Sequence, residues 1–234
     1  MSEPIPTGCV PIDELLGGGL ERGIVTQLYG PPASGKTNLA LSAAVQTAAA
    51  GGMALYIDTE GISVDRFEAL ARGAAPDDDL DSVASRVMVS DALDFEEQRE
   101  AVRDAGDLAD QLDLIILDSA TGFYRLERDN DDEGRTLRSV TKQITHLLAL
   151  ARRHDLAVLA TNQVYSDPDS DGSRARPLGG HTLTHWSGAI VRLERFRGGN
   201  RRATLEKHRS RATGETARFL ITNDGLETSD DGSL

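Results

Sequence analysis

The chain has 234 residues, 39% of them hydrophobic, and a formal net charge of −13. This length suits one large hydrophobic core, and apolar runs such as Leu114–Leu117 are far too short to span a bilayer. The single cysteine, Cys9, excludes an intramolecular disulfide, and no charged-then-apolar leader opens the sequence. We therefore expect a globular protein of a reducing cytoplasm.

Arginine carries almost all of the positive charge, because only three lysines are present. Scarce lysine combined with abundant Asp resembles salt-adapted proteins more than an ordinary acidic protein. At about 1 M salt the Debye length is roughly 3 Å, so net acidity does not exclude a nucleic-acid partner. The charge is also segregated: Asp77–Glu133 carries a local net charge of −14, and Arg192–Arg218 one of +6.

Short β-rich runs alternate with helix-like stretches, which predicts a parallel sheet with crossover helices. Three later runs predict antiparallel strands joined by Gly-rich turns. We expect strands at 24–29, 54–58, 86–89, 112–117, 156–161, 189–196, 201–207 and 218–222, and helices at 36–50, 64–72, 95–109 and 135–154. The predicted fold class is α/β, a mostly parallel sheet with helices on both faces and antiparallel C-terminal strands. We expect a single domain over residues 1–234, with a short extension at 1–10 and a frayed tail at 229–234.

One segment matches the phosphate-binding pattern G-x-x-x-x-G-K-[ST] without a mismatch, between a predicted strand and a predicted helix. Its residues are Gly30, Pro31, Pro32, Ala33, Ser34, Gly35, Lys36 and Thr37. Glycines let backbone N–H groups close around phosphate oxygens, and the helix N-terminus adds partial positive charge. Lys36 is expected to reach the β- and γ-phosphates, and the Thr37 hydroxyl to ligate Mg²⁺. The alternative is a chance Gly/Pro turn before a helix.

Two carboxylates follow predicted strands. Asp118 ends the apolar strand that contains Leu114–Leu117, which predicts a second Mg²⁺-binding residue beside the phosphates. Glu60 follows the strand at 54–58, where a carboxylate can orient and deprotonate a water that attacks the γ-phosphate. Taken singly, either residue is as well explained by an ordinary turn or a solvated loop.

Six motifs in order resemble the core of the RecA/RadA recombinase family, and most closely its short archaeal paralogues. The resemblance runs from about Ile5 to Glu227. The motifs are the opening Thr7–Leu20, the phosphate loop, Tyr56–Gly61, Asp118–Thr121, Thr161–Val164 and Gly179–His185. It implies a RecA-like P-loop ATPase core that uses ATP and Mg²⁺.

The resemblance also implies individual roles. Glu60 falls on the catalytic glutamate, Gln163 on the glutamine that senses the γ-phosphate, and His185 on a histidine that helps that sensing. Arg66 lies near the arginine that stacks on adenine, although the spacing differs by about one residue. A packed or capping role for His185 remains the alternative.

Two segments match the family's DNA-binding loops, Gly122–Arg138 and the stretch between Gln163 and Gly179. Both carry more carboxylates than strand exchange would favour, since carboxylates repel nearby phosphates. The N-terminus leaves no room for a helix-hairpin-helix domain, and no polymerisation segment is evident. From these loops and the basic tail we expect DNA contacts by Tyr124, Arg125, Arg128, Arg135, Arg138, Arg174, Arg176, Arg201 and Arg202.

The favoured function is an ATP- and DNA-binding accessory protein of homologous recombination and repair, with weak Mg²⁺-dependent ATPase activity and no strand exchange of its own. The implied partners are single-stranded or branched DNA, a main RadA-type recombinase or junction-processing enzymes, and further copies in an oligomer, but no membrane. One alternative is a KaiC-like signalling ATPase, because Lys207 and Arg209 resemble a pair that reaches a neighbour's γ-phosphate. Their i, i+2 spacing predicts that both side chains lie on the same face of one strand. Another is a binding module in which ATP only switches partner affinity.

Overall fold

A computed structural model describes residues 2–76, 80–123, 133–165, 176–178, 180–196 and 199–229. Within these ranges no helix is both long enough and apolar enough to cross a membrane.

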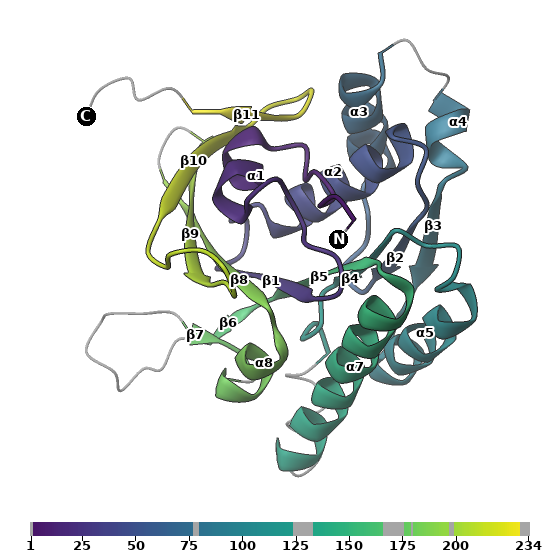
Figure 1. Cartoon of the computed structure of the whole chain (residues 1–234). Helices are drawn as coiled ribbons and strands as arrows, with labels where there is room; N and C mark the ends of the chain where they lie inside the picture. Colours follow the sequence, from purple (N-terminus) through teal and green to yellow (C-terminus); the bar gives the residue numbers. More distant parts are fainter. Residues whose placement is uncertain are drawn as a thin grey trace.

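The structure is built on a nine-stranded sheet with the order β11-β10-β9-β8-β1-β5-β4-β2-β3 (Figure 1). Its strands are β1 (Val25–Tyr29), β2 (Ala54–Asp58), β3 (Val87–Asp91), β4 (Leu114–Asp118), β5 (Ala157–Asn162), β8 (Ala189–Arg195), β9 (Asn200–Lys207), β10 (Thr216–Ile221) and β11 (Leu226–Thr228). A two-stranded ribbon pairs β6 (Val164–Tyr165) with β7 (Arg176–Pro177). The helices are α1 (Val10–Leu16), α2 (Lys36–Ala49), α3 (Val64–Ala74), α4 (Leu80–Ala84), α5 (Phe95–Leu108), α7 (Glu133–His154) and α8 (Gly180–Trp186).

The strands from β8 to β3 in this order are parallel, whereas β8 through β11 pair in antiparallel fashion. Every residue of β1, β2, β4 and β5 is buried, because helices cover both faces of the sheet. Helices α1, α2, α3 and α4 lie on one face, and α5, α7 and α8 on the other (Figure 1). The predicted fold class is confirmed.

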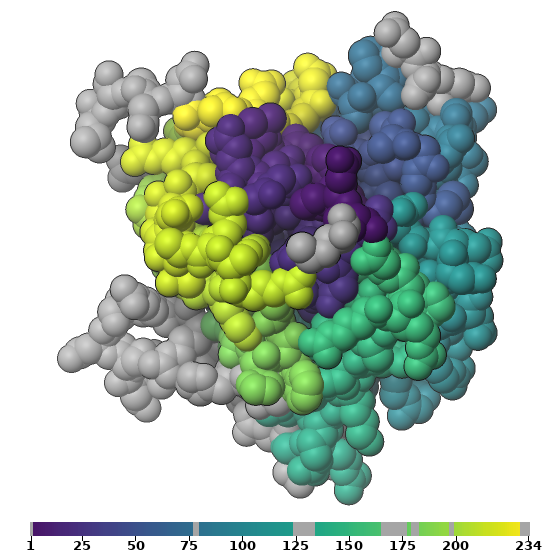
Figure 2. All heavy atoms as spheres, viewed as in Figure 1, coloured from purple at the N-terminus to yellow at the C-terminus, as the bar shows by residue number. Residues whose placement is uncertain are grey.

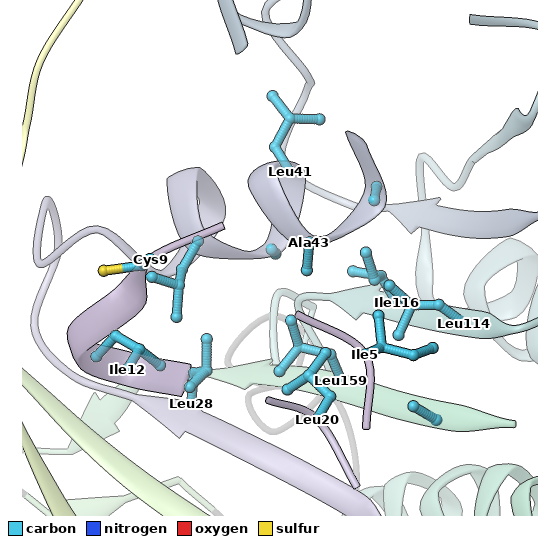
Figure 3. Packing of buried hydrophobic residues seen from close by; sticks show 14 of the residues in the cluster. Ile5, Cys9, Ile12, Leu20, Leu28, Leu41, Ala43, Leu114, Ile116 and Leu159 are labelled. Atoms are coloured by element: carbon cyan, nitrogen blue, oxygen red, sulfur yellow. The ribbon is translucent and has the colours of Figure 1, made fainter. Parts of the chain in front are cut away.

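The N-terminal residues belong to the core. Ile5 forms an isolated antiparallel bridge with Leu20, and the side chains of Ile5, Cys9 and Ile12 are buried in the same hydrophobic cluster as Leu28 of β1 (Figure 3). In Figure 2 this segment, in purple, packs between the yellow C-terminal strands and the blue α2–α3 region. Ile5, Thr7 and Cys9 therefore contribute to the core, whereas Ser2, Glu3 and Pro6 are exposed.

Most predicted elements appear within a few residues of their expected bounds, and β2 matches at both ends. Helices α1, α4 and α8 were not predicted, since five to seven residues are too few for a helical period to stand out. The short strand β11 was missed as well. Of the predicted frayed tail, Ser229 bonds through its hydroxyl to Asn200 Oδ1 at 2.8 Å, and residues 230–234 lie outside the described ranges.

Candidate functional site at the carboxyl edge of the sheet

The phosphate loop, Gly30–Thr37, joins the end of β1 to the start of α2, as its sequence predicts. A Cβ atom on Gly30 would lie 2.3 Å from the Leu193 carbonyl oxygen, so only glycine fits against β8. Gly35 caps α2 with φ 102°, and Ala33 has φ 59°. A loop of this kind at a helix N-terminus presents backbone N–H groups to an anion.

Lys36 lies within the loop and is 8% exposed. Its Nζ atom donates to the carbonyl oxygens of Gly30 at 3.0 Å and Pro31 at 3.2 Å. Burial lowers the pKa of Lys36, and the negative charges of Glu60 and Asp118 oppose that shift. The ammonium group is therefore held over the phosphate loop, within the electrostatic reach of both predicted carboxylates.

Asp118 ends β4 and is almost fully buried. The Tyr56 hydroxyl donates to Asp118 Oδ2 at 2.6 Å, and the Thr161 hydroxyl donates to Oδ1. Burial raises the pKa of Asp118, while hydrogen bonds from Thr161, Tyr56 and Thr37 lower it. The contact with Thr37 unites the two side chains predicted to hold Mg²⁺.

The donor set fits that ion. Mg²⁺ is usually held by one or two carboxylates or hydroxyls together with phosphate oxygens and water, and Thr37 and Asp118 supply one of each side-chain type. The buried hydroxyls of Ser34 and Ser119 have no hydrogen-bond partner among the described residues. Unpaired polar groups beside the loop suit a polar ligand.

Glu60 and Gln163 meet beyond the ends of β2 and β5, where Gln163 Nε2 donates to Glu60 Oε1 at 3.0 Å. Asp58 fixes the turn that carries Glu60: its Oδ1 atom accepts from the N–H groups of Glu60 and Gly61 at 3.0 and 2.9 Å. Its Oδ2 atom accepts from Ile62 N at 2.6 Å. The predicted base and the predicted sensor are thus joined at one edge of the sheet.

Three residues lie in the quoted motifs but were given no role from the sequence: Asp58, Tyr56 and Thr161. An Asp followed closely by Gly at a strand end is a recognisable turn signal, so Asp58 was open to prediction. The roles of Tyr56 and Thr161 depend on which strands flank β4, and a single sequence carries no direct signal for that.

Arg66 of α3 holds the turn between β10 and β11. Its guanidinium donates to the carbonyl oxygens of Thr222 and Asn223, both at 2.7 Å, and of Gly225 at 3.2 Å. Its Nε atom donates to Asn38 Oδ1 at 2.7 Å, one residue beyond the phosphate loop. The guanidinium therefore lies near the nucleotide loop, and its stacking on adenine stays a prediction.

Arg201 does not lie on the open face that we expected for a DNA contact. It is 9% exposed, and a Cβ atom on Gly35 would lie 3.8 Å from its Nε atom. That buried Nε has no partner among the described residues, and burial lowers the pKa of Arg201. Side chains alternate along a strand, and Arg201 shares the inward face of β9 with Ala203 and Leu205. In this position the Arg201 side chain lies beside the phosphate loop and exposes little surface to a DNA strand.

Arg202 faces the opposite side of β9. Its Nε and Nη2 atoms donate to Glu194 Oε2 at 3.0 and 2.9 Å, and its guanidinium lies 4.9 Å from the centre of the Phe196 ring. The side chain is 37% exposed. Arg202 is accessible but already paired, and its contact with DNA stays a prediction.

Lys207 and Arg209 point to different places. Lys207 ends β9, and its Nζ atom donates to the carbonyl oxygens of Thr184 and His185 at 2.7 and 3.2 Å. Arg209 lies beyond the strand, and its Nε atom is 2.9 Å from both carboxylate oxygens of Glu21. The expectation that both share one strand face is therefore wrong, because β9 ends at Lys207.

His185 occupies the last turn of α8 and is exposed, with its ring edge-to-face against Trp186 at 5.1 Å. The predicted DNA-contact residues Tyr124, Arg125, Arg128 and Arg174 lie outside the described residues. Arg176 lies in β7, but only its backbone is described.

Comparison with known proteins agrees with this geometry. The family model described as Rad51 matches residues 3–229. A "DNA repair and recombination protein RadB" of Halobacterium salinarum is 62% identical over 95% of this chain and 94% of the relative. A protein of the same name from Methanococcoides burtonii is 43% identical over 97% of this chain and 98% of the relative.

A solved structure described as "Crystal structure of the RadB recombinase" superposes with a TM-score of 0.82. It is 34% identical in sequence and covers 97% of this chain and 100% of the solved one. The chain therefore belongs to the Rad51 family and, within that family, groups with the RadB proteins.

Proposed function

We propose that this protein is an ATP-dependent accessory factor of homologous recombination and DNA repair that binds DNA and hydrolyses ATP slowly. The observation that carries the proposal is the meeting of the phosphate loop, Asp118 and the Glu60–Gln163 pair at one sheet edge. The names of the relatives, each a DNA repair and recombination protein, supply the biological setting.

Each group of residues at this site has a separate role in ATP hydrolysis. Backbone N–H groups of the phosphate loop bind the phosphates, and the Lys36 ammonium neutralises charge on the β- and γ-phosphates. Glu60 accepts a proton from the water that attacks the γ-phosphorus, and the bond between that phosphorus and the β–γ bridging oxygen breaks. Thr37 and Asp118 would hold Mg²⁺, which neutralises phosphate charge when bound.

Gln163 offers a link between nucleotide state and the following segment. Its side-chain amide donates to Glu60, and its backbone N–H donates to the Thr121 hydroxyl oxygen at 3.2 Å. A γ-phosphate near Glu60 competes for the same amide, so its arrival repositions the side chain that precedes β6. The β6–β7 region would then favour one conformation when the γ-phosphate is present and another when it is absent. A nucleotide-dependent switch requires such a pair of conformations.

The test measures ATP hydrolysis and affinity for single-stranded DNA together, at molar potassium chloride, with and without the main recombinase. Slow turnover, measurable DNA affinity and a stimulated recombinase are expected. ATP turnover without any DNA affinity would favour the signalling-ATPase alternative. DNA affinity that changes with ATP but is identical in wild type and Glu60→Gln would favour a binding module in which hydrolysis is incidental.

A further inference from the structure

A cleft of about 470 Å³ lies between α5 and α7, and none of its lining residues belongs to the phosphate loop. The two helices lie side by side (Figure 1). Each follows a parallel strand, β3 or β4, so both begin at the carboxyl edge of the sheet and run back along the same face. The lining residues come mainly from the N-terminal halves of both helices, the halves nearer the edge where the nucleotide site also lies.

Basic side chains from both helices line this cleft. Helix α5 contributes Arg99 and Arg103, one turn apart, and α7 contributes Arg135, Arg138, Lys142 and His146. No carboxylate is among the lining residues that the structure describes. Five permanent cations thus converge on one cleft in a protein with a formal net charge of −13.

Among the described residues, carboxylates of α5 partly offset the charge of the two α5 arginines. Arg99 pairs with Glu96, and Arg103 Nε lies 3.0 Å from Asp104 Oδ1, both on α5 itself. All four side chains are more than half exposed, at 56% to 68%. Exposed pairs of this kind contribute about 0–1 kcal/mol, so an arriving phosphate can replace them.

The spacing suits a polymer with regularly repeated negative charges. On α7, Arg138, Lys142 and His146 are four residues apart, which places them about 6 Å apart along the helix axis. Arginine supplies four of the five permanent cations, and its planar fork forms bidentate bonds to phosphate. Phe95, partly exposed, lies on the first turn of α5 and adds an aromatic surface for a base.

The geometry points to this α5–α7 cleft as a binding site for the sugar–phosphate backbone of single-stranded DNA. A duplex is too wide to enter a cleft of this volume, whereas a cationic groove with an aromatic platform is typical of single-strand binding. The assignment rests on the proposed DNA-binding function. It adds residues of α5 and of the middle of α7 to those that contact DNA.

The test uses two cleft variants of the full chain, Arg138→Ser/Lys142→Ser and Arg99→Ser/Arg103→Ser. The matched control is Arg152→Ser/Arg153→Ser, which removes two exposed arginines from the far end of α7. Circular dichroism and thermal unfolding check that all three fold. Affinity for a fluorescein-labelled oligothymidylate is measured by anisotropy across a potassium chloride series.

Each cleft variant is expected to lose roughly tenfold in affinity at the lowest salt. The slope of log K against log salt should fall in magnitude by about 1.4, since two single-strand phosphate contacts are lost. The control should keep the wild-type slope. Phe95→Leu should reduce the preference for oligothymidylate over an abasic strand of equal length.

Cleft variants that behave like the control, while the wild type still binds DNA, would overturn this site and leave the proposed function standing. A wild type without DNA affinity would instead remove the DNA arm of the proposed function, and this site with it. Polyglutamate that displaces the oligonucleotide from the wild type and loses its own affinity in the cleft variants would identify an acidic protein segment as the occupant.

Discussion

The parallel strands and the C-terminal antiparallel strands position their polar residues in different ways. Asp118 and Glu60 follow buried parallel strands, whose carboxyl ends all meet at one edge. On β9, neighbouring residues alternate between opposite faces, so Arg201 lies by the phosphate loop and Arg202 pairs with Glu194. A residue at the end of a parallel strand can therefore be assigned to the site from its sequence position alone. On β9, a shift of one residue moves an arginine to the opposite face of the sheet and so changes its role.

Lys36→Ala should have the largest effect, because the loop has no other side chain that can supply positive charge to the β- and γ-phosphates. We expect most ATP binding to disappear, which nucleotide titration by fluorescence or calorimetry would measure. Thermal unfolding serves as the check on folding. A folded variant with wild-type affinity would contradict the phosphate-loop assignment.

Glu60→Gln should keep ATP bound and slow its hydrolysis by about 100-fold, the scale expected for loss of a general base. Glutamine retains an oxygen that can accept from Gln163, so the local contact survives. Steady-state phosphate release measures the rate. Asp65→Asn, which removes an exposed carboxylate on α3, is the control, and equal turnover in all three proteins would leave Glu60 without a catalytic role.

Arg201→Gln should weaken nucleotide binding by about tenfold, the scale of one hydrogen bond to a charged group. The same change should leave the free protein as stable or more stable, because a buried and incompletely paired charge is removed. Arg202→Gln is the matched control: it breaks an ion pair worth about 0–1 kcal/mol and should not alter nucleotide affinity. Equal nucleotide affinities in both variants would separate Arg201 from the site.

Replacing Lys207 and Arg209 together with alanine should have the smallest effect on hydrolysis, less than about twofold. Lys207 is held by the last carbonyls of α8, where a cation contributes about 0.3–1 kcal/mol, so a modest drop in melting temperature is expected. ATPase activity is compared at low and high protein concentration. A large loss that occurs only in the assembled protein would support the action of these residues on a neighbour's nucleotide.

The sequence predicted the local structure correctly where a hydrophobic strand is followed directly by a recognisable motif. The phosphate loop, the strand before it and the helix after it were all predictable, because buried strands leave little freedom for the residues at their ends. Local net charge was a poorer guide. In the basic segment Arg192–Arg218 several charges are paired within the segment: Arg192 pairs with Glu194 and Glu206, and Arg202 pairs with Glu194.

The acidic segment Asp77–Glu133, by contrast, contains the two arginines that α5 places in the cleft. Packing determines which face of a helix lies against its neighbour. The net charge summed over a segment of sequence contains no information about that face. The alternation of Arg201, Ala203 and Leu205 is present in the sequence and could have indicated an inward arginine, but Arg201 was predicted as a DNA contact. The unpaired Nε atom became visible only once β9 was placed beside the phosphate loop.

The contact between Arg66 and the β10–β11 turn has a consequence for how this sequence can change over evolution. Three of the acceptors are backbone carbonyls, which every amino acid provides, so the turn can exchange most side chains without losing its anchor. Helix α3, which packs against this turn, tolerates fewer substitutions. A Cβ atom on Gly73 would lie 2.3 Å from the Asp224 carbonyl oxygen, so even alanine would force the helix and the turn apart. Over evolution, substitutions should therefore accumulate in the β10–β11 turn, while Arg66 and Gly73 should rarely change.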